Sequence, residues 1–185
     1  AVCGVKGVRM RVLGLGAKVM EKLGVSTQLI AGGDIFPALE LGTIDATEYS
    51  MPAIDLDLGF YQVAKHYYFP GWHQPMSMGE FSINLDRWNE LSQTQREIIK
   101  GACMESMLRG FAQGEAIQFG ALKELQEKGV TLHRWSPEIM EALKKAWDEV
   151  VTEEAANDAD FARVWKSLSE FREGYKLWAA YGYLD

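Results

Sequence analysis

The fold is decided by residues 30–49, IAGGDIFPALELGTIDATEY, which read as one complete unit of loop, helix, loop and strand. Gly32 and Gly33 can take loop dihedrals that are closed to other residues. Asp34 is placed to cap the helix, and Pro37 suits its first turn. We therefore predict a short helix that the chain enters from a glycine loop.

The end of this unit carries the strongest functional pointer in the chain. Gly42 ends the helix, so residues 43–49 form a short extended segment that delivers Glu48 and Tyr49 to the end of an element. Ligands of α/β proteins are held at strand ends. The pattern therefore favours a binding site at Glu48, with a plain scaffold segment as the alternative.

The first 48 residues alternate between strand and helix patterns. The predicted elements are a strand at 8–13, a turn at 14–16, a helix at 17–23, a strand at 25–31, a helix at 33–42 and a strand at 44–48. Such alternation is typical of a parallel sheet. We therefore predict an α/β fold class, with a parallel or mixed sheet and flanking helices.

The middle of the chain is rich in aromatic residues. The predicted elements are a helix at 51–60, an aromatic strand from 65 that Pro and Gly break into a loop at 70–75, and a strand at 77–84. The loop holds Trp72 and His73, and exposed aromatics with a titratable ring often line a pocket. A loop histidine with no task is the alternative, and His66 and His133 are expected to be structural.

Long helices dominate the C-terminal half. Ser92 and Gln95 form a capping box that opens a long amphipathic helix reaching about Lys128, in which Cys103 is expected to be buried. A strand at 130–135 comes next, and Ser136, Pro137 and Glu138 form a helix start for a helix at 139–155. A last helix follows Asp158. The last helix has more large apolar groups than one face needs.

The composition argues against several classes of protein. The net charge is −7 and the pI is about 5.1, and no run of Lys and Arg interleaves with aromatics, so nucleic acid is not an expected partner. No window approaches the ~20 apolar residues of a membrane span. Cys3 and Cys103 lie far apart without neighbouring ligands, which predicts no zinc site. The opening residues show no signal peptide, which leaves a processed chain or a piece of a longer protein as alternatives.

A glycine pattern after the first strand raises the alternative of an NAD-type, nucleotide-binding enzyme domain. Gly14 and Gly16 fit that motif, but the third glycine position holds Val19, and Asp34 follows two glycines where it should close a strand. The sequence offers no Ser, His and Asp set and no paired carboxylates at a useful spacing. No catalytic residue is therefore predicted, and an enzyme is not expected. A fragment that only dimerises is a further alternative.

Arg11 is the candidate for recognising an anion. It lies in an alternating strand with Val8, Met10 and Val12 and is predicted to share a face with Arg9. A planar guanidinium fixed on a strand can grip a carboxylate with two parallel hydrogen bonds. Glu48 would then hold a hard cation that neutralises both its own carboxylate and the acid of the ligand. An arginine on an edge or at the surface is the alternative.

Five blocks, in this order, carry a resemblance to a known family. They are residues 6–11 (KGVRMR), 31–39 (AGGDIFPAL), 42–48 (GTIDATE), 68–72 (YFPGW) and 84–92 (NLDRWNELS). Together they resemble the extracytoplasmic solute receptors of TRAP (tripartite ATP-independent periplasmic) transporters, of the DctP type, in the branch that takes keto and hydroxy acids. The match runs through nearly the whole chain.

The resemblance implies a periplasmic binding protein of type II-like fold that delivers a small organic acid to a membrane permease. It implies that Arg11 clamps the substrate carboxylate, and that Glu48 and the main-chain carbonyl of Tyr49 hold a sodium or calcium ion beside the ligand. Members of this branch carry Trp at the position of Tyr49. The Tyr49 ring would keep this wall of the site aromatic. The loop with Trp72 and His73 is similar to another part of the pocket.

The resemblance covers only the C-terminal part of the family fold, without its first βα units. It implies that residues 1–48 belong to the second lobe and that residues 49–84 cross the hinge and enter the first lobe. Residues 85–185 would be the helical region that completes both lobes. The resemblance also implies a homodimer through the last helix, with packing on its own core as the alternative. A site between two lobes needs walls from each, so this chain is expected to present about half of one.

Overall fold

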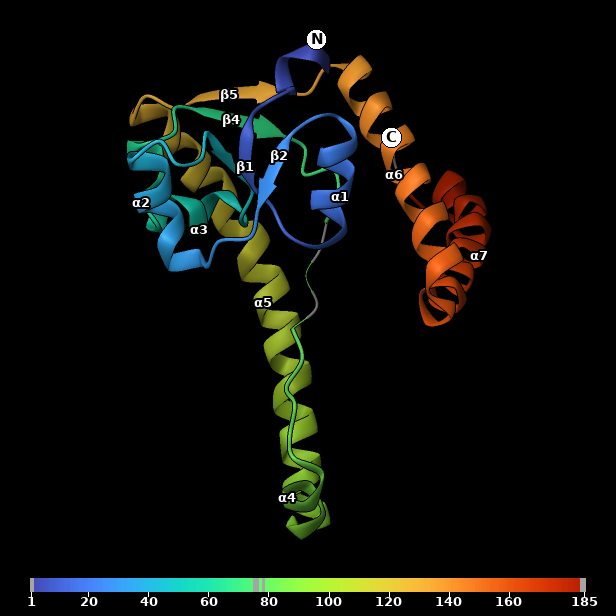
Figure 1. Cartoon of the computed structure of the whole chain (residues 1–185). Helices are drawn as coiled ribbons and strands as arrows, with labels where there is room; N and C mark the ends of the chain where they lie inside the picture. Colours follow the sequence, from blue (N-terminus) through green and yellow to red (C-terminus); the bar gives the residue numbers. More distant parts are fainter. Residues whose placement is uncertain (1, 75–76, 78, 184–185) are drawn as a thin grey trace. The chain divides into compact units, whose positions relative to one another are not determined.

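The computed structural model describes residues 2–74, 77 and 79–183 (Figure 1). It combines parallel strand pairs with long helices, so the predicted α/β class is confirmed. The chain forms two compact units. The first contains the residues up to Leu29 together with those from Ser136 onward, and the second runs from Ile30 to Trp135. None of the helices in the described ranges has the length and apolar character needed to cross a membrane.

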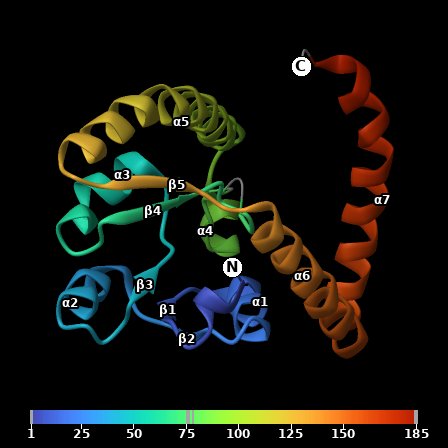
Figure 2. The ribbon, with the colours of Figure 1, turned by 90° about the horizontal axis from the view of Figure 1, so that it is seen from above.

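The first unit begins with a short βαβ arrangement. After the 3₁₀ turn η1 (Val2–Val5) come β1 (Arg9–Arg11), α1 (Gly14–Lys22) and β2 (Ser26–Gln28), and β1 pairs with β2 in parallel. Helices α6 (Pro137–Asn157) and α7 (Ala159–Gly182) complete the unit, and Figure 2 shows α6 leading into α7. The predicted helix start at Pro137 is confirmed.

The turn predicted at residues 14–16 is wrong, because α1 already starts at Gly14. Gly14 has φ +64°, a conformation that glycine adopts without steric cost. Gly14 therefore turns the chain into the helix by itself, and a turn of three residues is not needed.

Helix α1 packs against α6 through an apolar layer with charges at its edge. The buried side chains are Val12, Val19, Met20 and Val25 on one side, and Leu143, Ala146, Val150 and Val151 on the other. Two ion pairs join the helices, Lys18 Nζ to Glu154 Oε1 at 2.5 Å and Lys22 Nζ to Glu153 Oε1 at 2.6 Å. The lysine heads reach the glutamates at the margin while the apolar groups stay inside.

The second unit contains the segment of residues 30–49. Its elements in chain order are η2 (Gly32–Asp34), α2 (Ile35–Glu40), β3 (Ala46–Thr47), α3 (Pro52–Asp57), η3 (Phe60–Gln62), β4 (His66–Phe69), α4 (Leu85–Glu90), α5 (Gln93–Glu127) and β5 (Thr131–Arg134). Strands β4 and β5 pair in parallel, and α3 packs next to α5 (Figure 2). The predicted loop, helix, loop and strand order is confirmed, with a shorter strand than expected.

One detail of this segment corrects the prediction, and another confirms it. Asp34 makes no side-chain capping bond, because the 3₁₀ turn η2 leads directly into α2 and the N–H of Ile35 donates to the carbonyl of Gly32. Gly42 has φ +66° and ends the helix as predicted. The segment is held by a buried cluster of Ile35, Ile44 and Phe60.

Helix α5 is longer and more exposed than an ordinary core helix. Its capping box of Ser92 and Gln95 is confirmed. Along its 35 residues only Ala121 and Leu125 are buried, because only its C-terminal part packs against the described body of the unit. The prediction that Cys103 is buried is therefore wrong, since this side chain is exposed.

The strand predicted at 77–84 does not form in residues 77 and 79–84, while residue 78 lies outside the described residues. Residues 79–84 connect to α4, and the Asn84 side chain caps that helix by accepting the N–H of Asp86 at 3.0 Å and of Arg87 at 3.3 Å. A β-rich pattern needs a partner strand, and this stretch pairs with none in the described ranges. The end of the predicted loop, at Pro75, also lies outside them.

The buried cluster gives a test of how the segment before Glu48 is held. Ile44 is 1% exposed, whereas nearby Leu41 is 79% exposed. Ile44→Ala should lower the free energy of unfolding by about 2–5 kcal/mol through a buried cavity. Leu41→Ala removes a similar volume and should change it by less than about 0.5 kcal/mol. Urea unfolding followed by circular dichroism measures both, and equal effects would contradict this packing.

Candidate functional site

The predicted cation ligand and the predicted pocket loop meet in the second unit. Glu48 follows β3, and His73 lies in the loop after β4. Glu48 Oε2 lies 3.5 Å from His73 Nε2, and the two side chains are only 22% and 17% exposed. The ring of Trp72 packs on that of His73 with centroids 4.8 Å apart. Glu48, Trp72 and His73 thus form one half-buried cluster.

His73 carries a polar atom that the described residues leave unsatisfied. Its Nδ1 is buried and has no hydrogen-bond partner among them. Buried polar atoms of this kind are rare in folded proteins and need an explanation, such as a water, an ion or a ligand. The orphaned nitrogen is consistent with a cluster that receives a further polar group.

The Tyr49 ring packs against Phe60 and lies close to Gly32. It meets Phe60 edge to face at 5.8 Å. A Cβ atom on Gly32 would lie 2.7 Å from the Tyr49 hydroxyl oxygen, so a larger residue here requires the Tyr49 ring to move. The expectation that Gly32 and Gly33 need unusual dihedrals is wrong, because neither has a positive φ. Gly32 is needed for space, and Gly33 has open space around it.

The structure adds a pair of residues that the sequence did not reveal. Asp55, in α3, is 8% exposed, and the Tyr67 hydroxyl of β4 donates to its Oδ2. Burial raises the pKa of Asp55 to about 6, and the nearby charge of Glu48 adds to the rise. The hydrogen bond from Tyr67 and the N–H of Ser50 act in the opposite direction.

Two observations on the Asp55 carboxylate differ. Among the described residues its Oδ1 has no hydrogen-bond partner within the usual distance and angle limits, whereas the Ser50 N–H still lowers the pKa of Asp55. The Oδ1 atom is therefore unsatisfied, because a weak polar contact can stabilise the charge of a carboxylate without satisfying a buried acceptor. Burial also raises the pKa of Tyr67. The only sequence signal was an acid among apolar residues of a predicted helix, which is too common to single out.

Arg11 lies on β1 in the first unit and is only 6% exposed. Arg9 on the same strand is exposed. The alternative of a surface arginine is therefore wrong. A buried guanidinium is costly unless oxygen atoms surround it, which is the environment that a carboxylate clamp requires. The clamp itself, like the cation site at Glu48, stays a prediction.

The residues near Glu48 are suited to a hard cation. Sodium and calcium take oxygen ligands from carboxylates and main-chain carbonyls, and Glu48 and Tyr49 offer one of each. Within the described ranges no three His, Cys, Asp or Glu side chains gather around a common point. An ion here would thus depend on Glu48, main-chain oxygens and its ligand together. The donor set fits sodium or calcium better than zinc.

The Tyr49 packing can be tested with two adjacent glycines. Gly32→Ala should push the Tyr49 ring away from Phe60 and destabilise the fold by about 1–2 kcal/mol. Gly33→Ala is the matched control and should be close to neutral, because nothing lies near its Cβ. Urea unfolding and the ring NMR signals of Tyr49 report the two effects. Unchanged ring signals in Gly32→Ala would count against the close approach.

The buried carboxylate predicts a dependence of stability on pH. The pKa of Asp55 lies near 6 in the folded state, above the unfolded value of about 3.9. The folded state therefore binds this proton more tightly, and the stability it contributes is full below about pH 4 and is lost as pH rises through about 6. Asp55→Asn should remove this dependence.

Urea unfolding of the wild type and Asp55→Asn from pH 4 to pH 7.5 measures this effect. As the pH rises across this range, the free energy of unfolding of the variant should increase by roughly 2 kcal/mol relative to that of the wild type. The comparison cancels the titration of groups that do not interact with Asp55. A constant difference between the two proteins would show that Asp55 has an ordinary pKa.

Comparison with known proteins supports the sequence resemblance. Residues 4–158 match the family DctP, described as bacterial extracellular solute-binding protein, family 7. The chain is 38% identical over 178 residues to a monocarboxylate 2-oxoacid-binding periplasmic protein of Nostoc sp., covering 96% of this chain and 49% of that protein.

Solved structures agree in fold. A TRAP transporter solute-binding protein of Bordetella bronchiseptica, a mixed-occupancy dimer with calcium and picolinate in its bound site, is 34% identical with a TM-score of 0.87, covering 96% of this chain and 53% of that one. A TRAP periplasmic solute-binding protein of Pseudoalteromonas atlantica with sodium and pyruvate is 30% identical with a TM-score of 0.88, covering 96% and 54%.

The chain spans about half the length of these relatives. They are solute-binding proteins and not enzymes, so the prediction of no enzymatic activity is confirmed and the NAD-type alternative is dropped. The type II-like periplasmic binding fold is likewise confirmed by the structural match. The chain belongs to the DctP family of bacterial extracellular solute-binding proteins.

Proposed function

We propose that this chain is part of the solute receptor of a TRAP transporter, which captures a small 2-oxo or 2-hydroxy carboxylate in the periplasm and delivers it to the membrane permease. The observation that carries this proposal is the half-buried Glu48 carboxylate beside His73 and Trp72. The Nostoc relative is named for binding 2-oxoacids, and the Pseudoalteromonas structure holds pyruvate with sodium.

The chemistry of such a ligand divides into two recognition tasks. Its carboxylate needs a fixed cationic partner, and the buried guanidinium of Arg11 can offer two parallel hydrogen bonds. Its 2-oxo or 2-hydroxy oxygen is a weaker acceptor, for which a bound sodium or calcium ion supplies positive charge. Glu48 and the main-chain carbonyl of Tyr49 would hold that ion.

The remaining site residues control access of water. The Trp72 ring contacts the His73 ring at a tilt of 48°, and His73 Nε2 lies 3.5 Å from Glu48 Oε2. Apolar and aromatic walls lower the local dielectric, which strengthens each ionic contact inside the site. Specificity for a small acid would follow from the space left beside Tyr49, Trp72 and His73.

The wider organisation is also proposed. Residues 1–48 would belong to the second lobe, 49–84 to the hinge crossing and first lobe, and 85–185 to the helical region that completes them. A homodimer would form through α7, which exposes large apolar side chains including Phe171, Leu177 and Trp178. The dimeric Bordetella relative is consistent with this arrangement.

Removing the guanidinium tests the carboxylate clamp. Arg11→Ala should weaken pyruvate binding by roughly 30-fold or more, equivalent to about 2 kcal/mol, since a buried charged pair loses one partner. Arg9→Ala, on the same strand but exposed, is the matched control and should leave affinity unchanged. Isothermal titration calorimetry with pyruvate, in sodium or calcium, measures both variants.

Two further results define the outcome. Arg11→Lys keeps a charge but loses the planar fork, so it should bind more weakly than the wild type even when its circular dichroism is native. Glu48→Gln should remove the dependence of binding on sodium or calcium. Wild-type affinity in a folded Arg11→Ala protein would overturn the clamp.

A further inference from the structure

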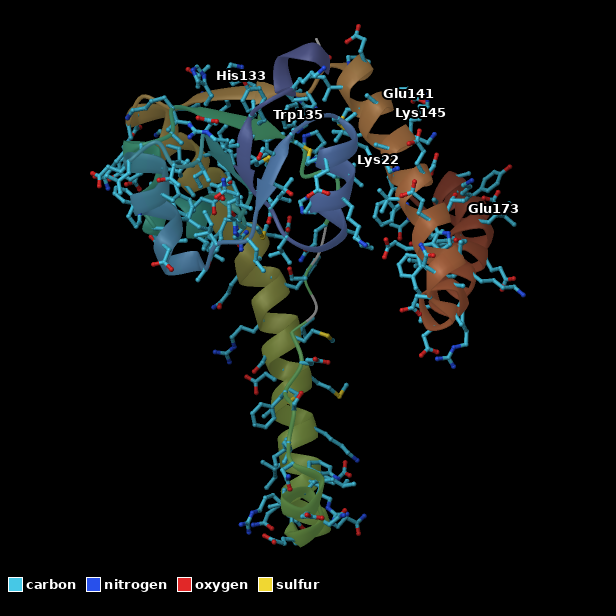
Figure 3. All side chains as sticks on the ribbon, viewed as in Figure 1. Lys22, His133, Trp135, Glu141, Lys145 and Glu173 are labelled. Carbon is cyan, nitrogen blue, oxygen red and sulfur yellow. The ribbon has the colours of Figure 1, made fainter. Side chains whose placement is uncertain are left out.

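A second cluster of aromatic and imidazole rings lies on the β4–β5 pair, and no step of the proposed function uses it. His66 and Tyr68 belong to β4, His133 belongs to β5, and Trp135 follows β5 (Figure 3). Tyr68 and His133 are direct partners in the parallel register. His66 therefore lies diagonally across from His133 on neighbouring strands.

The two histidines present ring nitrogens to each other. His66 Nδ1 and His133 Nε2 are 3.0 Å apart, and the ring centroids are 5.1 Å apart. Two imidazoles that share one metal ion at about 2.0–2.1 Å, with an angle of about 90–109° between the bonds, place their nitrogens about 2.9–3.4 Å apart. The pair therefore already has the spacing of two neighbouring metal ligands.

The His133 ring is held in place by its neighbours. Tyr68 stacks on it with centroids 4.6 Å apart and planes 18° apart, and the other neighbour of Tyr68 is Trp135, at 4.6 Å and 22°. Groups that fix the plane of a histidine ring lower the entropy lost when it binds a metal. His66 is exposed, so an ion can reach the pair from solvent.

We propose that His66 and His133 form a binding site for one divalent late transition metal ion, such as zinc, nickel or copper, with water completing its coordination. Imidazole nitrogen favours these ions over sodium and calcium, which take oxygen ligands. The net charge of −7 adds a general attraction for cations. A purely structural N–H···N hydrogen bond between the rings is the competing explanation.

Zinc titration with three histidine variants tests the proposal. This chain has three histidines in all, so His73→Gln is a matched control that leaves the pair intact. The wild type and His73→Gln should bind one zinc ion with the same affinity in calorimetry at pH 7.5. His66→Gln and His133→Gln should each lose about tenfold or more in affinity.

A second variant guards against misfolding. Tyr68→Leu keeps both histidines but removes the stacked ring, so it should bind zinc more weakly than the wild type while still binding better than either histidine variant. Circular dichroism checks that each variant is folded. Zinc affinity that is unchanged in folded His66→Gln and His133→Gln, or a wild type that binds no zinc, would overturn the site. Because pyruvate binding is measured separately, either result leaves the proposed receptor function intact.

Discussion

The packing of the segment before Glu48 is the constraint on which the candidate site depends. Ile44 is buried with Ile35 and Phe60, and the same Phe60 ring supports Tyr49 at 5.8 Å. Since Ile44 and Tyr49 flank β3, the core fixes both ends of the short strand. Glu48 is thereby delivered to one place without capping bonds or long strands of its own. A rigid approach of this kind reduces the entropy lost when a ligand is held.

Electrostatics around Glu48 favour the arrival of positive charge. The Glu48 carboxylate repels the negative charge of Asp55. The pKa of Asp55 is raised by burial and, to a smaller extent, by this repulsion. His73 Nε2 lies 3.5 Å from the Glu48 carboxylate, and the ring is cationic only when protonated. A sodium or calcium ion would relieve the repulsion between the carboxylates while a substrate anion is held nearby. The cation and the organic acid would therefore stabilise each other.

Local rules predicted much of the fold, and non-local packing accounts for the rest. The Ser92 capping box, the helix end at Gly42 and the helix start at Pro137 need only neighbouring residues, and each is confirmed. The role of Gly32 depends on Tyr49, seventeen positions later, and the exposure of Cys103 depends on what α5 packs against. The roles of Arg11, Glu48 and Tyr49 came from their place in a family pattern. Asp55 was missed because Tyr67 comes from another element.

Ligand chemistry separates the two cation sites proposed for this chain. The Glu48 region offers oxygen atoms, which suit sodium and calcium, whereas His66 and His133 offer nitrogen atoms, which suit zinc, nickel and copper. Sodium and calcium bind imidazole weakly, so their higher concentrations would not fill the histidine pair. A transition metal would favour the histidine pair, because two nitrogen donors lie 3.0 Å apart there. The two proposals therefore assign different classes of ion to the two places in the chain.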